Sequence, residues 1–87
     1  MTDSVRQLAI DMTRFYVDLD PYGARDAMED NETPEQFITR SADTIADLED
    51  LRDTLQDWTS WGWADDPETA GQIQAFKSRL KNLEAVA

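Results

Sequence analysis

The side chains best able to do chemistry in this chain are its carboxylates. The 87 residues include 19 Asp or Glu and 8 Lys or Arg, with neither His nor Cys. Imidazole bases, thiol nucleophiles and zinc sites built from Cys or His are therefore excluded. Paired carboxylates can hydrolyse glycosides, but such an enzyme needs a cleft, and a chain this short lacks the bulk to build one. We expect no enzyme activity and no cofactor.

One row of carboxylates follows a predicted helix. Its members are Asp43, Asp47, Asp50, Asp53 and Asp57. At about 100° per residue they lie opposite the apolar stripe of that helix, and at about 1.5 Å per residue they span roughly 21 Å. The row can present negative charge to a groove built for phosphates, although it is sparser than duplex DNA, which carries about one charge per 1.7 Å. The alternative is the solvated face of an amphipathic helix.

Three tryptophans surround Gly62, namely Trp58, Trp61 and Trp63. Trp58 continues the apolar stripe, so we expect it to be buried. Trp61 and Trp63 cannot both face the same way, and we expect one of them to be half-exposed. An exposed tryptophan can anchor a partner protein, and the alternative is that the cluster only closes the end of the fold.

Residues 18–29 resemble a calcium-binding EF-hand loop. The matching residues are Asp18, Asp20, Gly23, Asp26 and Glu29, at loop positions 1, 3, 6, 9 and 12. Tyr22 stands where an oxygen ligand is expected, Arg25 stands where an apolar residue packs, and Pro34 leaves little room for an exiting helix. We therefore predict no metal site and keep calcium binding as a remote alternative.

The elements that position these residues are helices. Asp20-Pro21, Thr33-Pro34 and Asp66-Pro67 each combine a capping residue with a proline suited to a first helical turn. Apolar residues recur at helical spacing, and strand signals are nearly absent. The sequence predicts a single all-α domain over 1–87, a small antiparallel helical bundle. Its helices are expected at about 4–19, 34–60 and 67–85, with a short one at about 21–29.

The formal net charge of −11 bears on the partner. It opposes direct binding to nucleic acid or to an anionic membrane, and it favours a basic protein surface. Nucleic-acid-binding proteins are the candidate class of partner. In size and charge alone, the chain resembles small phage-encoded inhibitors of host defence, including anti-CRISPR and anti-restriction proteins that mimic DNA. That resemblance implies an inhibitory module. From their own pattern in the sequence, the expected partner-binding residues are the five aspartates with Trp61 and Trp63.

The alternative function is a structural or assembly module that acts through apolar helix packing. Ile10 and Val17 give the first helix a second apolar side, which is covered by residues 21–29 or leads to a homodimer. No apolar run approaches the roughly 20 residues of a membrane span, and the N-terminal residues do not resemble a secretion signal. We therefore expect a cytoplasmic protein.

Overall fold

The structure, a computed structural model, describes residues 4–45 and 47–86. These residues form the helices α1 (Val5–Leu19), α2 (Pro21–Ala27), α3 (Pro34–Thr44), α4 (Leu48–Ser60) and α5 (Pro67–Val86), with a short 3-10 helix, η1 (Trp63–Asp65), before α5. The prediction of a small all-α bundle is confirmed.

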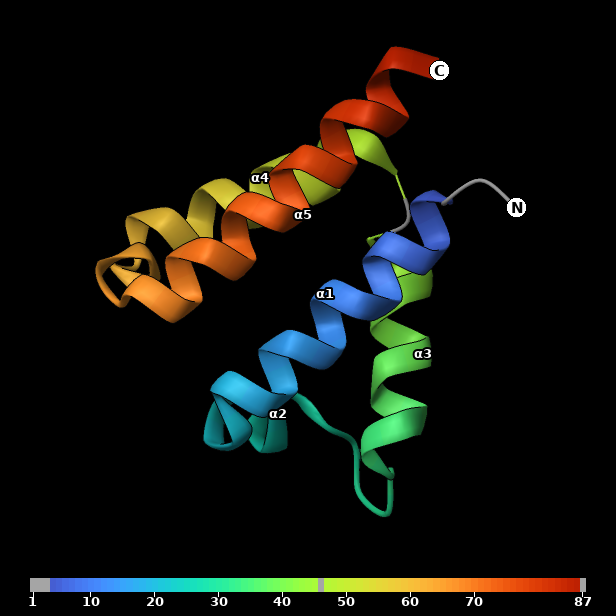
Figure 1. Cartoon of the computed structure of the whole chain (residues 1–87). Helices are drawn as coiled ribbons and strands as arrows, with labels where there is room; N and C mark the ends of the chain where they lie inside the picture. The colour runs from blue at the N-terminus through green and yellow to red at the C-terminus, as the bar shows by residue number, and fades with distance from the viewer. Residues whose placement is uncertain (1–3, 46, 87) are drawn as a thin grey trace.

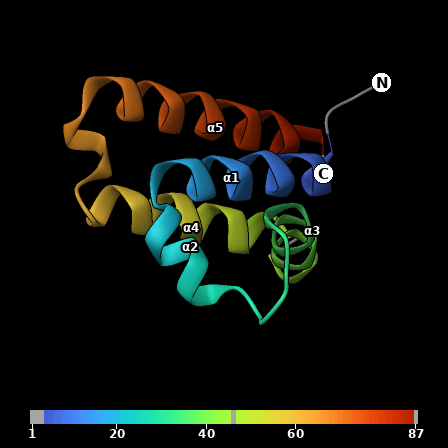
Figure 2. The same ribbon diagram turned by 90° about the horizontal axis from the view of Figure 1, so that it is seen from below.

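The bundle has three helices that run side by side and one that crosses them. Helices α4 and α5 are antiparallel neighbours joined through η1, and α1 lies alongside them (Figure 1). Helix α3 crosses this group and packs on α1, so that Figure 2 shows it nearly end-on while the others run across the view. Helix α1 therefore contacts α2, α3 and α5 and occupies the centre of the fold.

The predicted helix starts are confirmed by their caps. The side chain of Asp20 accepts a hydrogen bond from the backbone N–H of Gly23 (3.0 Å) at the start of α2. Thr33 and Gln36 form a capping box at the start of α3, with reciprocal bonds of 3.2 and 2.9 Å. Asp66 caps the first turn of α5, where its side chain accepts a hydrogen bond from the backbone N–H of Thr69 (3.0 Å). Proline at the next position loses nothing, because the N–H that it lacks would have no partner inside the helix.

The prediction of one continuous helix over 34–60 is wrong, because the segment folds as α3 and α4. The N–H of Ile45 closes the last turn of α3, and its backbone then leaves helical geometry (φ −109°, ψ 30°). Asp47 starts α4, since its side chain accepts from the N–H of Asp50 (2.9 Å). Ala46 lies outside the described residues. The break allows α3 to pack across α1 while α4 packs along α5.

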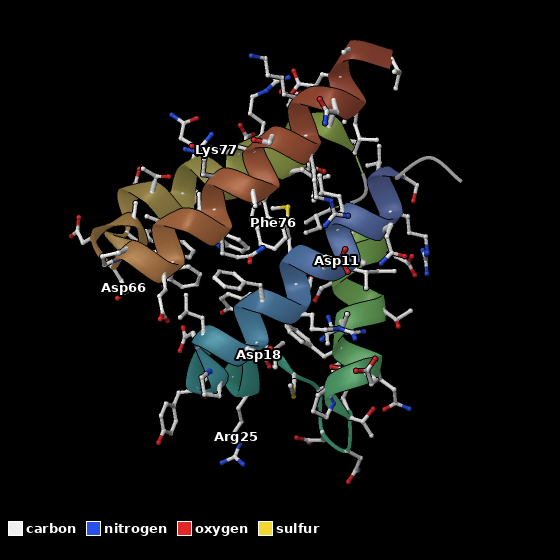
Figure 3. The ribbon with its side chains drawn as sticks, viewed as in Figure 1. Asp11, Asp18, Arg25, Asp66, Phe76 and Lys77 are labelled. Atoms are coloured by element: carbon white, nitrogen blue, oxygen red, sulfur yellow. The ribbon has the colours of Figure 1, made fainter. Side chains whose placement is uncertain are left out.

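The core forms where α1, α4 and α5 meet. Leu8, Met12, Leu51 and Leu55 are its largest fully buried side chains. Phe76 points from α5 toward α1, whereas its neighbour Lys77 points to the other side of the helix, as Figure 3 shows.

The second apolar side that we expected on α1 is covered only in part. Ile10 and Val17 are half-buried, so α1 does not expose a fully open second apolar side. On α2, Ala24 is buried, whereas Ala27, the last residue of the helix, is exposed.

Arginines link the helices through ion pairs. Arg6 pairs with Asp43, and Arg14 pairs with Glu35 (3.3 Å), both between α1 and α3. Two further pairs join α5 to its neighbours, Arg79 with Asp11 of α1 (2.9 Å) and Arg52 of α4 with Glu84 (3.0 Å). Ion pairs at the surface contribute only about 0–1 kcal/mol each, so these pairs add little to the stability of the fold.

Glu32 and Arg40 form the pair with the clearest electrostatic consequence. Two hydrogen bonds of 2.8 Å from the guanidinium lower the pKa of Glu32 from an ordinary 4.5 to about 2. A carboxylate with a lowered pKa stabilises the fold above its unfolded pKa, and the contribution is lost as the pH falls through the folded pKa. We expect Arg40→Gln to return the Glu32 pKa toward its ordinary value, as measured by NMR titration of the carboxyl carbon. The stability difference between wild type and variant should shrink between pH 4.5 and about 2; an unchanged Glu32 pKa would contradict this assignment.

Candidate acidic and aromatic binding surface

The five predicted aspartates do not form one straight row. Asp43 lies on α3 and is paired with Arg6, and Asp47 is the N-cap of α4. Only Asp50, Asp53 and Asp57 share one regular helix, α4. They form one flank of that helix, because their spacings of 3, 4 and 7 keep them within about 60° at 100° per residue. We call these three residues the acidic flank.

The carboxylates of the acidic flank have no basic partner within the described residues. No ion pair and no side-chain hydrogen bond joins them to another of those residues, and Asp53 and Asp57 are exposed. Of the basic side chains of α5, Arg79 pairs with Asp11, and the Nζ of Lys77 lies 3.5 Å from the hydroxyl of Thr59. Within the described residues, no cation therefore pairs directly with the acidic flank.

The three tryptophans have different surroundings. Trp58 is buried, with 3% of its surface exposed, as expected. Trp63 is half-buried and stacks on Trp58 (5.3 Å between ring centroids) and on Tyr16 (6.0 Å). Trp61 is 60% exposed and touches only the edge of Trp63 (5.6 Å) among the ring contacts of the described chain. Trp61 is therefore the tryptophan that a partner can reach.

Gly62 sets this arrangement. It adopts the left-handed conformation (φ +87°, ψ 8°), which glycine adopts without strain, and it ends α4 directly after Trp61. The turn reverses the chain through η1, and Trp63 packs inward while Trp61 stays at the surface.

Tyr16 carries a hydroxyl beside the same cluster. Burial raises the pKa of Tyr16 above its usual value of 10.0, and the charges of Asp20 and Asp26 raise it further. The hydroxyl is therefore neutral at physiological pH and acts as a hydrogen-bond donor or acceptor, not as an anion.

A groove of about 250 Å³ opens between α1, α3 and α4. It is lined by Met12, Thr13 and Tyr16 of α1, by Phe37, Ser41 and Ile45 of α3 and its C-cap, by Thr54, Asp57 and Trp58 of α4, and by Trp61. Asp57 of the acidic flank and the exposed Trp61 thus line one hollow. The sequence had indicated the acidic and aromatic residues separately. The groove could not be foreseen, because it depends on the break that lets α3 cross α1.

Residues 18–29 do not have the backbone of a calcium loop. Most of the segment is helix α2, Asp20 is engaged as its cap, and Arg25 projects outward from it (Figure 3). No group of three or more Asp or Glu side chains in residues 4–45 and 47–86 converges on a position that could hold a metal ion. The EF-hand resemblance therefore does not extend to the geometry.

Asp47 illustrates how a carboxylate of the predicted row acts in the fold. Replacing it with alanine should cost about 1 kcal/mol of stability, because the first turn of α4 loses its cap. Asp47→Ser removes the same charge but keeps a capping oxygen, so it should remain close to wild type. Urea unfolding of both variants measures the difference. Equal losses for alanine and serine would assign the effect to the charge and contradict the capping role.

The candidate surface therefore consists of the acidic flank, Trp61 and the groove beside them, and of these the sequence predicted Asp50, Asp53, Asp57 and Trp61. Across the described residues, no helix is both long and apolar enough to cross a membrane. Comparisons of the chain with protein-family models, with curated proteins and with solved structures found no match.

Proposed function

We propose that this protein is a non-enzymatic, acidic binding module that docks on a basic surface of a partner protein. The observation that carries the proposal is the acidic flank, Asp50, Asp53 and Asp57, which lacks basic partners within the described residues and lies beside the exposed Trp61. An unmatched charged surface next to an exposed aromatic ring combines the two features that most often give specificity and affinity at protein interfaces.

The distribution of arginines supports this proposal. Arg6, Arg14, Arg52 and Arg79 pair with acids between helices, and Arg40 pairs with Glu32. These five arginines therefore compensate acids on other parts of the surface, and none of these pairs involves the acidic flank of α4. With a formal net charge of −11, long-range attraction speeds encounter with a basic partner.

Nucleic-acid-binding proteins are the partner class that we propose, since their phosphate-binding surfaces are basic. One binding module of this kind is an inhibitor that docks on a nucleic-acid-binding defence complex. The acidic flank spans only about 10 Å, from seven residue-to-residue steps of about 1.5 Å each, so it is too short to imitate a long duplex. We therefore favour recognition of a local basic patch over extended DNA mimicry.

The second candidate is an assembly module that binds through apolar contacts. The observation that favours it is the exposure of large apolar side chains, 60% for Trp61 and 81% for Tyr22. Ionic strength separates the two functions, because attraction between exposed charges weakens as salt is added, whereas apolar packing does not.

The experiment that tests the proposal is a pull-down from extracts of the native host, followed by binding kinetics with the recovered partner. Asp50→Asn, Asp53→Asn and Asp57→Asn are combined in one variant. We expect association to slow by about tenfold and its salt dependence to flatten, because steering by charge is reduced.

The matched control removes the same number of charges elsewhere, by combining Asp26→Asn, Asp30→Asn and Glu68→Gln. These residues lie on α2, in the loop after it and on α5, and all are exposed. The control should change association much less. Equal effects of both triple variants would show that only the net charge matters, and no effect of either would contradict docking through the acidic flank.

A further inference from the structure

We propose that the groove between α1, α3 and α4 receives a bulky apolar side chain from a partner segment in which basic residues flank that side chain. This inference rests on the proposed function and deepens it, because it names the part of a basic partner that is recognised. It assigns the groove to a peptide segment with a defined pattern, not to a general charged surface.

The interior of the groove is apolar. Met12, Phe37 and Trp58, each at most 4% exposed, close its floor, and the half-buried Tyr16 and Ile45 line it nearer the surface. The hydroxyls of Thr13 and Thr54 donate to the carbonyls of Ala9 and Asp50, both at 2.8 Å, within their own helices. These hydroxyl protons are therefore already engaged, and the lining favours an apolar occupant.

The rim of the groove is suited to cations. Asp57 and Trp61 both line it, and Asp53 lies one turn before Asp57 on the same helix. A guanidinium or ammonium group beside the inserted side chain can pair with the carboxylates and lie over the exposed indole. The charge of the rim is therefore complementary to basic residues on either side of an apolar one.

Other occupants fit less well. A second copy of this chain would bring another net charge of −11 to the same place. The volume of about 250 Å³ lies below the roughly 300–1,000 Å³ typical of small-molecule sites. The larger hollow between α4 and α5, about 400 Å³, is lined by Arg52 and Lys77 and would repel a basic segment.

Two synthetic peptides of equal charge test this inference. Arg-Leu-Arg-Arg-Leu-Arg offers apolar side chains between basic ones, and Arg-Ser-Arg-Arg-Ser-Arg offers only the charge. Binding is measured by titration calorimetry and by tryptophan fluorescence, since Trp61 lines the groove and neither peptide contains tryptophan. We expect the leucine peptide to bind about tenfold more tightly, because burial of a leucine side chain in the groove removes apolar surface from water.

A variant that fills the groove provides the second part of the test. Ser41→Phe places a large ring among the lining residues, and Ser78→Phe adds the same ring to an exposed position of α5. The first should abolish the preference for the leucine peptide and leave binding of the serine peptide unchanged, while the second should alter neither. Circular dichroism checks folding, and Ser41→Leu replaces Ser41→Phe if the larger ring prevents it.

The outcomes distinguish this inference from the function on which it rests. Equal, salt-dependent binding of both peptides, unaffected by Ser41→Phe, overturns the groove as a binding site and leaves docking on a basic surface intact. Preference for the leucine peptide with no dependence on salt overturns the role of the basic flanks and the proposed function together. Binding of neither peptide overturns both.

Discussion

Replacing Trp58 by alanine is expected to lower the free energy of unfolding by about 3–5 kcal/mol. The indole is 3% exposed and contacts three other rings, those of Trp63 (5.3 Å), Phe15 (5.8 Å) and Phe76 (6.3 Å). Its removal leaves a cavity that rings fixed on three different elements cannot easily fill. Because small domains are stable by only about 5–15 kcal/mol, the loss should be evident in urea unfolding followed by circular dichroism.

Two other substitutions make this expectation specific. Trp58→Phe keeps an aromatic ring in the cluster and should cost clearly less than Trp58→Ala. Trp61→Ala removes a side chain that is 60% exposed and should change stability by no more than about 0.5 kcal/mol. A loss below about 1 kcal/mol for Trp58→Ala, or equal losses for Trp58 and Trp61, would show that Trp58 is not the centre of the cluster.

Helix starts were the part of the fold that local sequence determined best. At Asp20, Thr33 and Asp66, a side-chain oxygen and a following proline act within a single turn, so no distant residue is needed to specify them. The first and last helices were predicted to within about a residue of their observed ends, because continuous apolar stripes defined them.

The division between α3 and α4 depends on tertiary packing and was missed. The apolar spacing runs on from Ile38 through Ile45 to Leu48, so periodicity alone favours one helix. Asp47 was interpreted as one of several surface aspartates, although an aspartate is also a good N-cap. The packing of α3 across α1 decides between these roles. This packing joins residues more than twenty positions apart in the sequence, such as Arg14 and Glu35.

The same division explains why the candidate site was foreseen only in part. Asp50, Asp53 and Asp57 keep the expected helical spacing because all three belong to α4. Asp43 is lost from the row because α3 turns away and Arg6 of α1 pairs with it. Composition and spacing can indicate which side chains are charged or aromatic, but they do not reveal a groove formed by three helices that are distant in sequence.

Replacing Trp61 by alanine is expected to weaken binding to the recovered partner by about 30-fold, which corresponds to about 2 kcal/mol. Trp61 is exposed and borders the apolar groove. It is the C-cap of α4, the helix that carries the acidic flank. Its ring can therefore bury a large area against a partner without being needed for the fold. Because packed apolar contacts are lost mainly through faster dissociation, we expect the off-rate to rise and the association rate to change little.

The acidic triple variant, with Asp50, Asp53 and Asp57 changed to asparagine, should give the opposite kinetic pattern, with slower association and a smaller effect on dissociation. Measuring both variants at about 50 and about 300 mM salt separates the contributions, because the charge effect is screened at the higher concentration and the tryptophan effect is not. If the charge variant binds as wild type does while Trp61→Ala fails to bind, the docking surface is apolar and the acidic recognition proposed for α4 is wrong. If both variants weaken binding with these distinct signatures, charge brings the partner to the surface and Trp61 holds it there.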